Sequence, residues 1–136
     1  MCPSLLLIED DVYVRQALCR TLRGTFTITP YESAEPALAD VDAGKPFDAI
    51  LCDLNLTGMS GEQMHRELLS RSPASALRLV ILTGSAPFGP FAEALGVRFM
   101  TKPFSIPTLI RVLLAVCCPL LLSSNVPSKV PPNVQE

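Results

Sequence analysis

Aromatic residues are scarce in this chain of 136 residues. It has no Trp, and aromatic residues make up 6 % of it, although hydrophobic residues make up 49 %. The core must therefore be aliphatic. Lys and Arg form no basic block, and the formal net charge is −2. These features argue against direct nucleic acid binding through phosphate contacts. The length fits one domain.

Metal-binding cysteine motifs and long apolar runs are also missing. The five cysteines form no CxxC or Cys/His spacing, which favours free thiols in a reducing compartment. The apolar run near the N-terminus is too short for a signal peptide. The stretch from residue 109 to 122 contains Arg111 and Pro119 and is too short to span a bilayer. We therefore expect a cytoplasmic protein without membrane insertion.

Short apolar runs alternate with amphipathic segments, which is typical of parallel βα units. Pro30 interrupts the second of these runs, which favours an edge strand there. The pattern predicts an α/β fold, a doubly wound sheet of five parallel strands with helices on both faces. The expected strands are Leu5–Ile8, Thr25–Tyr31, Ala49–Cys52, Leu79–Leu82 and Val97–Thr101.

Chemically active side chains follow the predicted strands. In a doubly wound sheet, function lies at the carboxyl ends of the strands, so these side chains are expected to meet in one crevice. They are Glu9, Asp10 and Asp11 after the first strand, Asp53 after the third, Thr83 after the fourth and Lys102 after the fifth.

This set of side chains suits phosphoryl transfer. Clustered carboxylates repel one another, and a hard cation such as Mg²⁺, which prefers oxygen ligands, relieves the repulsion. Glu9, Asp10 and Asp53 could hold such an ion. A carboxylate beside Mg²⁺ and Lys102 can act as the nucleophile that forms an aspartyl phosphate. Thr83 can donate a hydrogen bond to a phosphoryl oxygen.

Four motifs, LLIEDD, ILCDLNLTGMSG, VILTGS and FMTKPF, occur in an order and at a spacing that resemble the receiver domains of two-component response regulators and hybrid histidine kinases. The resemblance covers residues 4–118. It implies a flavodoxin-like fold with strand order 2-1-3-4-5 and a bound Mg²⁺ that Mn²⁺ can replace. The roles it implies are metal binding by Glu9, Asp10, Asp53 and the backbone carbonyl of Asn55, phosphate acceptance by Asp53, and phosphate binding or switching by Thr83, Lys102 and Phe99.

The resemblance also implies partners and boundaries. The phosphoryl donor would be a histidine kinase or a histidine phosphotransfer protein, and a homodimer is possible. The domain is expected over residues 1–118, followed by a disordered Pro/Ser-rich tail over 119–136. The middle motifs look most like receivers at the C-terminus of hybrid kinases, and a stand-alone regulator is nearly as well supported. A receiver catalyses its own phosphorylation and slow dephosphorylation without being an enzyme in the usual sense.

Two departures from the family pattern concern the surface near the site. Thr57 stands where the family usually has Pro, so we expect a more mobile loop after Asp53. The segment between Thr83 and Lys102 is short and contains Pro87 and Pro90. It predicts a loop over residues 84–89 and a shortened fourth helix over 91–95.

Two alternatives come from other functional classes. A pseudo-receiver would bind partners without phosphorylation, and the altered fourth helix keeps this hypothesis open. A phosphatase of the haloacid dehalogenase type would need an Asp two residues after the nucleophile, where this chain has Asn55. We also expect His65 at the surface and Cys52 in the core without a redox role.

Overall fold

The computed structural model describes residues 2–84, 92, 94 and 96–117. Its five strands form one parallel sheet in the order β2-β1-β3-β4-β5, as predicted. The expected loop over 84–89, helix over 91–95 and tail over 119–136 lie wholly or mainly outside the described residues. The strands are β1 (Ser4–Ile8), β2 (Thr27–Tyr31), β3 (Ala49–Asp53), β4 (Leu79–Thr83) and β5 (Arg98–Thr101).

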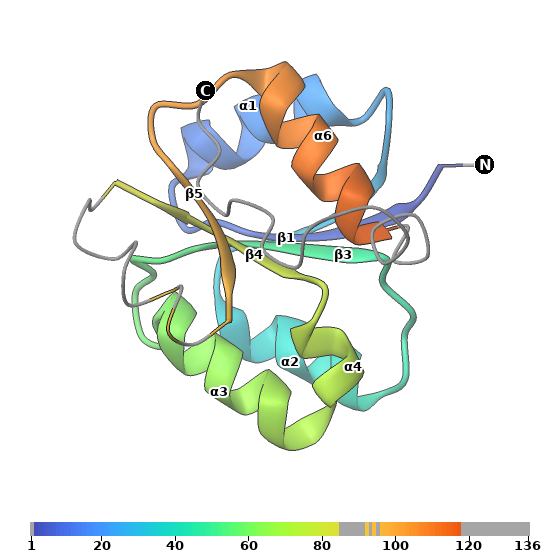
Figure 1. The fold of residues 1–136 in the computed structure, drawn as a ribbon, viewed down its shortest axis with the longest axis vertical. Coiled ribbons are helices and arrows are strands. Elements are labelled where there is room, and N and C mark those ends of the chain that lie inside the picture. The colour runs from blue at the N-terminus through green and yellow to red at the C-terminus, as the bar shows by residue number, and fades with distance from the viewer. Residues whose placement is uncertain (1, 85–91, 93, 95, 118–136) are drawn as a thin grey trace.

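Helices cover both faces of the sheet. Figure 1 shows α1 and α6 on one face and α2, α3 and α4 on the other. Within the described part of the chain, no helix is long and apolar enough to cross a bilayer. The helices are α1 (Val12–Leu22), α2 (Ala34–Asp42), α3 (Gly61–Arg71), α4 (Pro73–Ala76) and α6 (Ile106–Cys117).

The central strands are mostly apolar, since both of their faces are buried. Successive side chains of a strand point to opposite faces. Leu6 and Ile8 of β1 therefore pack under α2 and α3, whereas Leu5 and Leu7 pack under α1 and α6. The edge strand β2 has no fully buried residue, and Pro30 lies within it, so the predicted edge position is confirmed.

The strand order places the acidic residues together. The chain moves from β1 outward to β2, then returns to the other side of β1 with β3. The connections that leave β1 and β3 therefore diverge at one point, which is where doubly wound sheets have their ligand crevice. Glu9 and Asp10 follow β1, and Asp53 ends β3.

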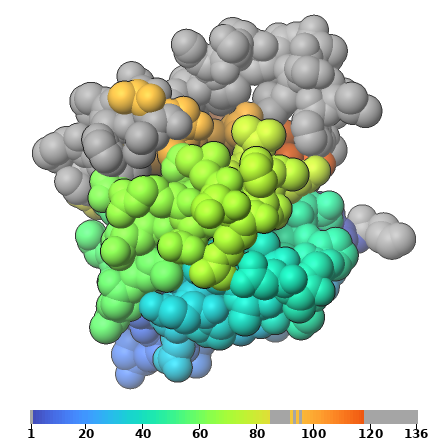
Figure 2. Space-filling view, turned by 90° about the horizontal axis from the view of Figure 1, so that it is seen from below, coloured from blue at the N-terminus to red at the C-terminus, as the bar shows by residue number. Residues whose placement is uncertain are grey.

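Helix α3 buries His65, which the sequence analysis expects at the surface. A capping box between Ser60 and Gln63 stabilises its first turn. Figure 2 shows α3 and α4 beside α2 on the surface of the molecule. His65, expected at the surface, is only 5 % exposed. The expectation was wrong because Gly61, Met64, His65 and Leu68 have the i, i+3, i+4, i+7 spacing of one buried helix face.

Neighbouring leucines of α3 allow a test of this packing. Leu68 is fully buried and Leu69 is 49 % exposed. We expect Leu68→Ala to lower the free energy of unfolding by about 2–5 kcal/mol, because it leaves a cavity in the core. Leu69→Ala should lower it by less than about 1 kcal/mol. Urea unfolding followed by far-UV circular dichroism measures both, and equal losses would contradict the assigned face of α3.

Candidate functional site

Three carboxylates meet at the carboxyl end of the sheet. Glu9, Asp10 and Asp53 each offer an oxygen, and these oxygens all lie within 4.8 Å of one another. Glu9 and Asp53 are buried, and Asp10 is partly buried. The structure therefore brings together the three side chains that the sequence analysis proposed as metal ligands.

The Glu9 carboxylate is the most deeply placed of the three. Its residue is 3 % exposed. One oxygen, Oε2, accepts a hydrogen bond of 3.2 Å from the backbone N–H of Asp11. The other, Oε1, is buried and has no hydrogen-bond partner among the described residues. Burial raises the pKa of the Glu9 carboxyl above its usual value, and the nearby Asp53 also contributes to the rise.

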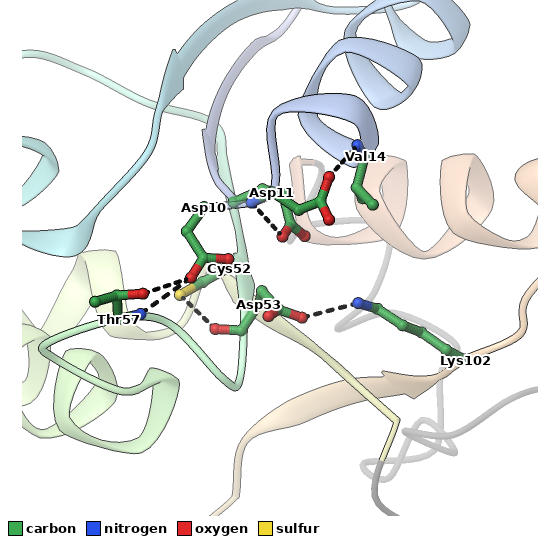
Figure 3. Close-up of polar contacts among 8 residues, drawn as sticks. Asp10, Asp11, Val14, Cys52, Asp53, Thr57 and Lys102 are labelled. Carbon is green, nitrogen blue, oxygen red and sulfur yellow. Dashed lines mark hydrogen bonds and ion pairs between the residues drawn. The ribbon is translucent and has the colours of Figure 1, made fainter.

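Lys102 supplies a positive charge next to Asp53. Its Nζ lies 3.0 Å from Asp53 Oδ1, in an ion pair whose carboxylate side chain is 9 % exposed. Lys102 follows β5, and its backbone N–H donates a 2.7 Å hydrogen bond to the carbonyl oxygen of Thr83. The peptide bond from Lys102 to Pro103 is cis. Figure 3 shows Lys102 and Thr57 reaching the acidic residues from opposite sides.

The two residues assigned switch roles lie on the neighbouring strands. Thr83 is the last residue of β4 and is fully buried. Phe99 lies in β5, is 1 % exposed and belongs to the core cluster on the α2–α3 face. β4 is parallel to β3 and adjacent to it, so its carboxyl end lies beside Asp53 at the same end of the sheet. The switching roles of Thr83 and Phe99 stay predictions.

Residues adjacent to Asp53 have different surroundings. Asn55 is exposed in the loop after β3, and metal binding by its carbonyl stays a prediction. Cys52 is fully buried, and its thiol donates a 3.3 Å hydrogen bond to the carbonyl oxygen of Asp53. Burial strongly raises the pKa of this thiol, and the charges of Asp53 and Glu9 raise it further. A protonated, buried thiol is unreactive, in agreement with its expected core position.

A contact that the sequence analysis did not predict connects Thr57 to Asp10. The backbone N–H and the hydroxyl of Thr57 both donate to Asp10 Oδ2, at 3.1 and 3.0 Å. Gly58 follows with a φ of 87°, a conformation that glycine adopts readily. The loop expected to be more mobile without Pro is thus hydrogen-bonded to the acidic cluster. In the sequence, the only hint of this contact is that a residue with a hydroxyl stands where the family pattern predicts Pro.

Gly61 allows α3 to begin directly beside Asp53. A Cβ atom at this position would lie 3.0 Å from Leu54 Cα and 3.1 Å from the carbonyl oxygen of Asp53. The Gly61 N–H also donates a 2.9 Å hydrogen bond to the carbonyl oxygen of Leu54. The backbone that carries Asp53 is therefore in contact with the first turn of α3.

The residues present fit a hard divalent cation. Three carboxylates converge on one point, and the buried Glu9 Oε1 has no partner within the described residues. A bound cation would satisfy that oxygen and offset the repulsion between the three charges. All of the available ligands are oxygens, which is the preference of Mg²⁺.

Comparison with known proteins identifies the class. Residues 5–114 match the family described as the response regulator receiver domain. The chain is 32 % identical over 111 residues to the C4-dicarboxylate transport transcriptional regulatory protein DctD of Rhizobium meliloti, a match that covers 80 % of this chain. The chain therefore belongs to the receiver domain family of two-component response regulators.

Other relatives agree with this assignment. The cell cycle response regulator CtrA of Brucella ovis is 35 % identical over 106 residues, which cover 74 % of this chain. The structure of a sensor protein from Polaromonas sp. JS666 is 30 % identical, with a TM-score of 0.74, and the match covers 87 % of this chain and 98 % of that one. The chain matches 24 % of the length of DctD and 44 % of CtrA, so it corresponds to one part of those proteins.

The close packing at Gly61 leads to a prediction about stability. Gly61→Ala should lower the free energy of unfolding by about 1–3 kcal/mol, because the added methyl group overpacks the backbone at Leu54 and Asp53. Gly24→Ala is the control, since a Cβ there meets nothing within 4 Å, and it should change the stability by less than about 1 kcal/mol. Urea unfolding of both variants provides the measurement. Equal effects would contradict the close approach.

The raised pKa of Glu9 leads to a prediction about pH. In the unfolded chain Glu9 titrates near 4.5, so the folded protein binds more protons between this value and the raised pKa. The contribution of Glu9 to the stability of the wild-type protein should therefore fall as pH rises through that window. In EDTA, Glu9→Gln should be more stable than wild type at neutral pH, and the gain should disappear below pH 4.5.

Urea midpoints measured across this pH range test the prediction. Glu32→Gln is the control, because Glu32 is exposed, and its midpoint should stay close to that of wild type. A Glu9→Gln protein that is no more stable than wild type at neutral pH would show that burial of this carboxylate carries no cost.

Proposed function

We propose that Asp53 accepts a phosphoryl group from a phosphohistidine donor in a Mg²⁺-dependent reaction. The observation that carries the proposal is the ion pair between Asp53 and Lys102, at 3.0 Å, inside the cluster of three carboxylates. Lys102 provides a cation that can pair with the incoming phosphoryl oxygens once Asp53 has been modified. Glu9 and Asp10 would hold the ion together with Asp53, and the Asn55 carbonyl is a further proposed ligand.

The proposed transfer exchanges one bond to phosphorus for another. A carboxylate oxygen of Asp53 attacks the phosphorus, and the bond between phosphorus and the donor's imidazole nitrogen breaks. The imidazole retains the electron pair of that bond. Catalysis of such a transfer depends mainly on positioning and charge neutralisation, and a bound Mg²⁺ would neutralise charge on the phosphoryl oxygens. Water later hydrolyses the aspartyl phosphate, which gives inorganic phosphate and free Asp53.

The proposed signal is a rearrangement around the new phosphate. The phosphoryl group carries about 1.5–2 negative charges at neutral pH, and it replaces the single negative charge of the Asp53 carboxylate. Thr83 lies on the strand beside β3 and would donate its hydroxyl to a phosphoryl oxygen. Phe99 is on the next strand, β5, and is the proposed aromatic partner in the same switch. The intact set of acids with Lys102 supports phosphorylation over a pseudo-receiver.

The proposal extends to partners and location. Receiver domains act with histidine kinases or phosphotransfer proteins, and we propose such a protein as the donor here. We also propose a cytoplasmic location, signalling through protein contacts rather than nucleic acid binding, and Mn²⁺ as a substitute ion. Self-association as a homodimer and an origin in a hybrid kinase belong to the same proposal.

Phosphorylation can be tested with acetyl phosphate, a small donor that needs no partner protein. The protein is incubated with acetyl phosphate and Mg²⁺, and its intact mass is measured. We expect the mass gain of one phosphoryl group, no gain for Asp53→Asn, and none in EDTA. The control is Asp42→Asn, because Asp42 is half exposed and pairs with Arg71 on the surface. This variant should be modified like wild type.

A phosphorylated histidine kinase domain is the second donor. Transfer from it should show the same dependence on Asp53 and Mg²⁺. If neither donor modifies the wild-type protein, the proposal is wrong and the pseudo-receiver hypothesis replaces it. Modification that persists in Asp53→Asn would instead place the acceptor at another residue.

A further inference from the structure

Thr57 binds one oxygen of Asp10 through two donors. Its amide nitrogen lies 3.1 Å and its Oγ1 lies 3.0 Å from Asp10 Oδ2. The two residues belong to different loops, one that follows β1 and one that follows β3. Hydrogen bonds to a carboxylate are stronger than those between neutral groups. The pair of donors therefore fixes one loop against the other at the acidic cluster.

The hydrogen bonds from Thr57 fix the orientation of the Asp10 side chain, which packing alone does not do. Asp10 is only partly buried, so burial alone leaves its side chain free to rotate. Two donors on Oδ2 select one orientation, and Figure 3 shows the second oxygen of Asp10 on the side away from Thr57. That second oxygen remains available to a cation. The entropy cost of ordering Asp10 is then met before the ion binds.

We propose that Thr57 is a positioning residue that raises the affinity of the site for Mg²⁺ through Asp10. The proposal rests on the Mg²⁺ dependence of the proposed function. Groups that hydrogen-bond to metal ligands orient them, and their loss commonly weakens metal binding by 10-fold or more. Pro, which the family pattern predicts at this position, has neither a hydroxyl nor an N–H, so it could make neither of these two hydrogen bonds.

The same hydrogen bond could instead weaken Mg²⁺ binding. If the ion had to bind Asp10 Oδ2, Thr57 would compete with it, and removal of the hydroxyl would tighten Mg²⁺ binding. The sign of the change in affinity therefore separates the two cases. The Thr57 side chain is exposed, so a substitution of this residue changes the hydrogen bond without opening a cavity in the core.

The experiment compares Thr57→Val with Thr57→Ser. Val has nearly the same shape as Thr and keeps the backbone donor but lacks the hydroxyl, whereas Ser keeps both donors. Isothermal titration calorimetry of the unphosphorylated protein with Mg²⁺ gives the dissociation constants. We expect binding to Thr57→Val to be about 10-fold weaker and binding to Thr57→Ser to be close to wild type. Urea midpoints in EDTA check that both variants fold, and the midpoint of Thr57→Val should be only slightly lower than that of wild type, because the variant loses one hydrogen bond to a carboxylate.

Two other outcomes would overturn the proposal. Thr57→Val that binds Mg²⁺ as tightly as wild type, or more tightly, rules out positioning by the hydroxyl while leaving the proposed phosphorylation intact. Wild-type protein that binds no Mg²⁺ overturns both this inference and the Mg²⁺ dependence of the proposed function. Phosphorylation of Thr57→Val at saturating Mg²⁺ should reach the wild-type extent, which separates an effect on ion affinity from damage to Asp53.

Discussion

Mutual repulsion between three carboxylates is the constraint on which this site depends. Their oxygens lie within 4.8 Å of one another at the end of a buried sheet, where water screens charge poorly. The fold offsets this repulsion from several directions. Lys102 pairs with Asp53, the Asp11 N–H donates to Glu9, and Thr57 donates twice to Asp10. One buried oxygen of Glu9 is left without a partner among the described residues, and it indicates where a cation belongs.

Each of these offsetting groups comes from a connection that leaves the carboxyl end of a strand. Lys102 follows β5, Asp11 follows β1 and Thr57 follows β3. The core below them is held by alternate aliphatic residues of the strands, which pack separately against the helices on each face. Stability thus comes from the two apolar layers, whereas the polar edge contains groups that destabilise the protein until a ligand binds. The pKa of Glu9, raised by burial, is the sign of this cost.

The sequence predicts the sheet and the acidic cluster well because both follow from local patterns. Uninterrupted apolar runs mark strands buried on two faces, and the residues that end those runs must share one edge. Contacts between loops have no such periodic signal. The hydrogen bonds from Thr57 to Asp10 span 47 residues, and the close approach of Gly61 to Asp53 depends on the exact path of the backbone. The expectation that His65 lies at the surface was wrong because its spacing matches the buried face of α3.

Pro30 also affects whether the exposed edge strand β2 can pair with a strand of another molecule. The N–H of Thr27 points toward the preceding segment, where it donates to the carbonyl oxygen of Pro3. Because backbone nitrogens alternate in direction along a strand, those of Ile28 and Pro30 face the outer side of β2. Proline has no N–H, so the outer edge of β2 carries a gap in its row of donors. Such a gap hinders the addition of another strand, which protects an exposed sheet edge from aggregation.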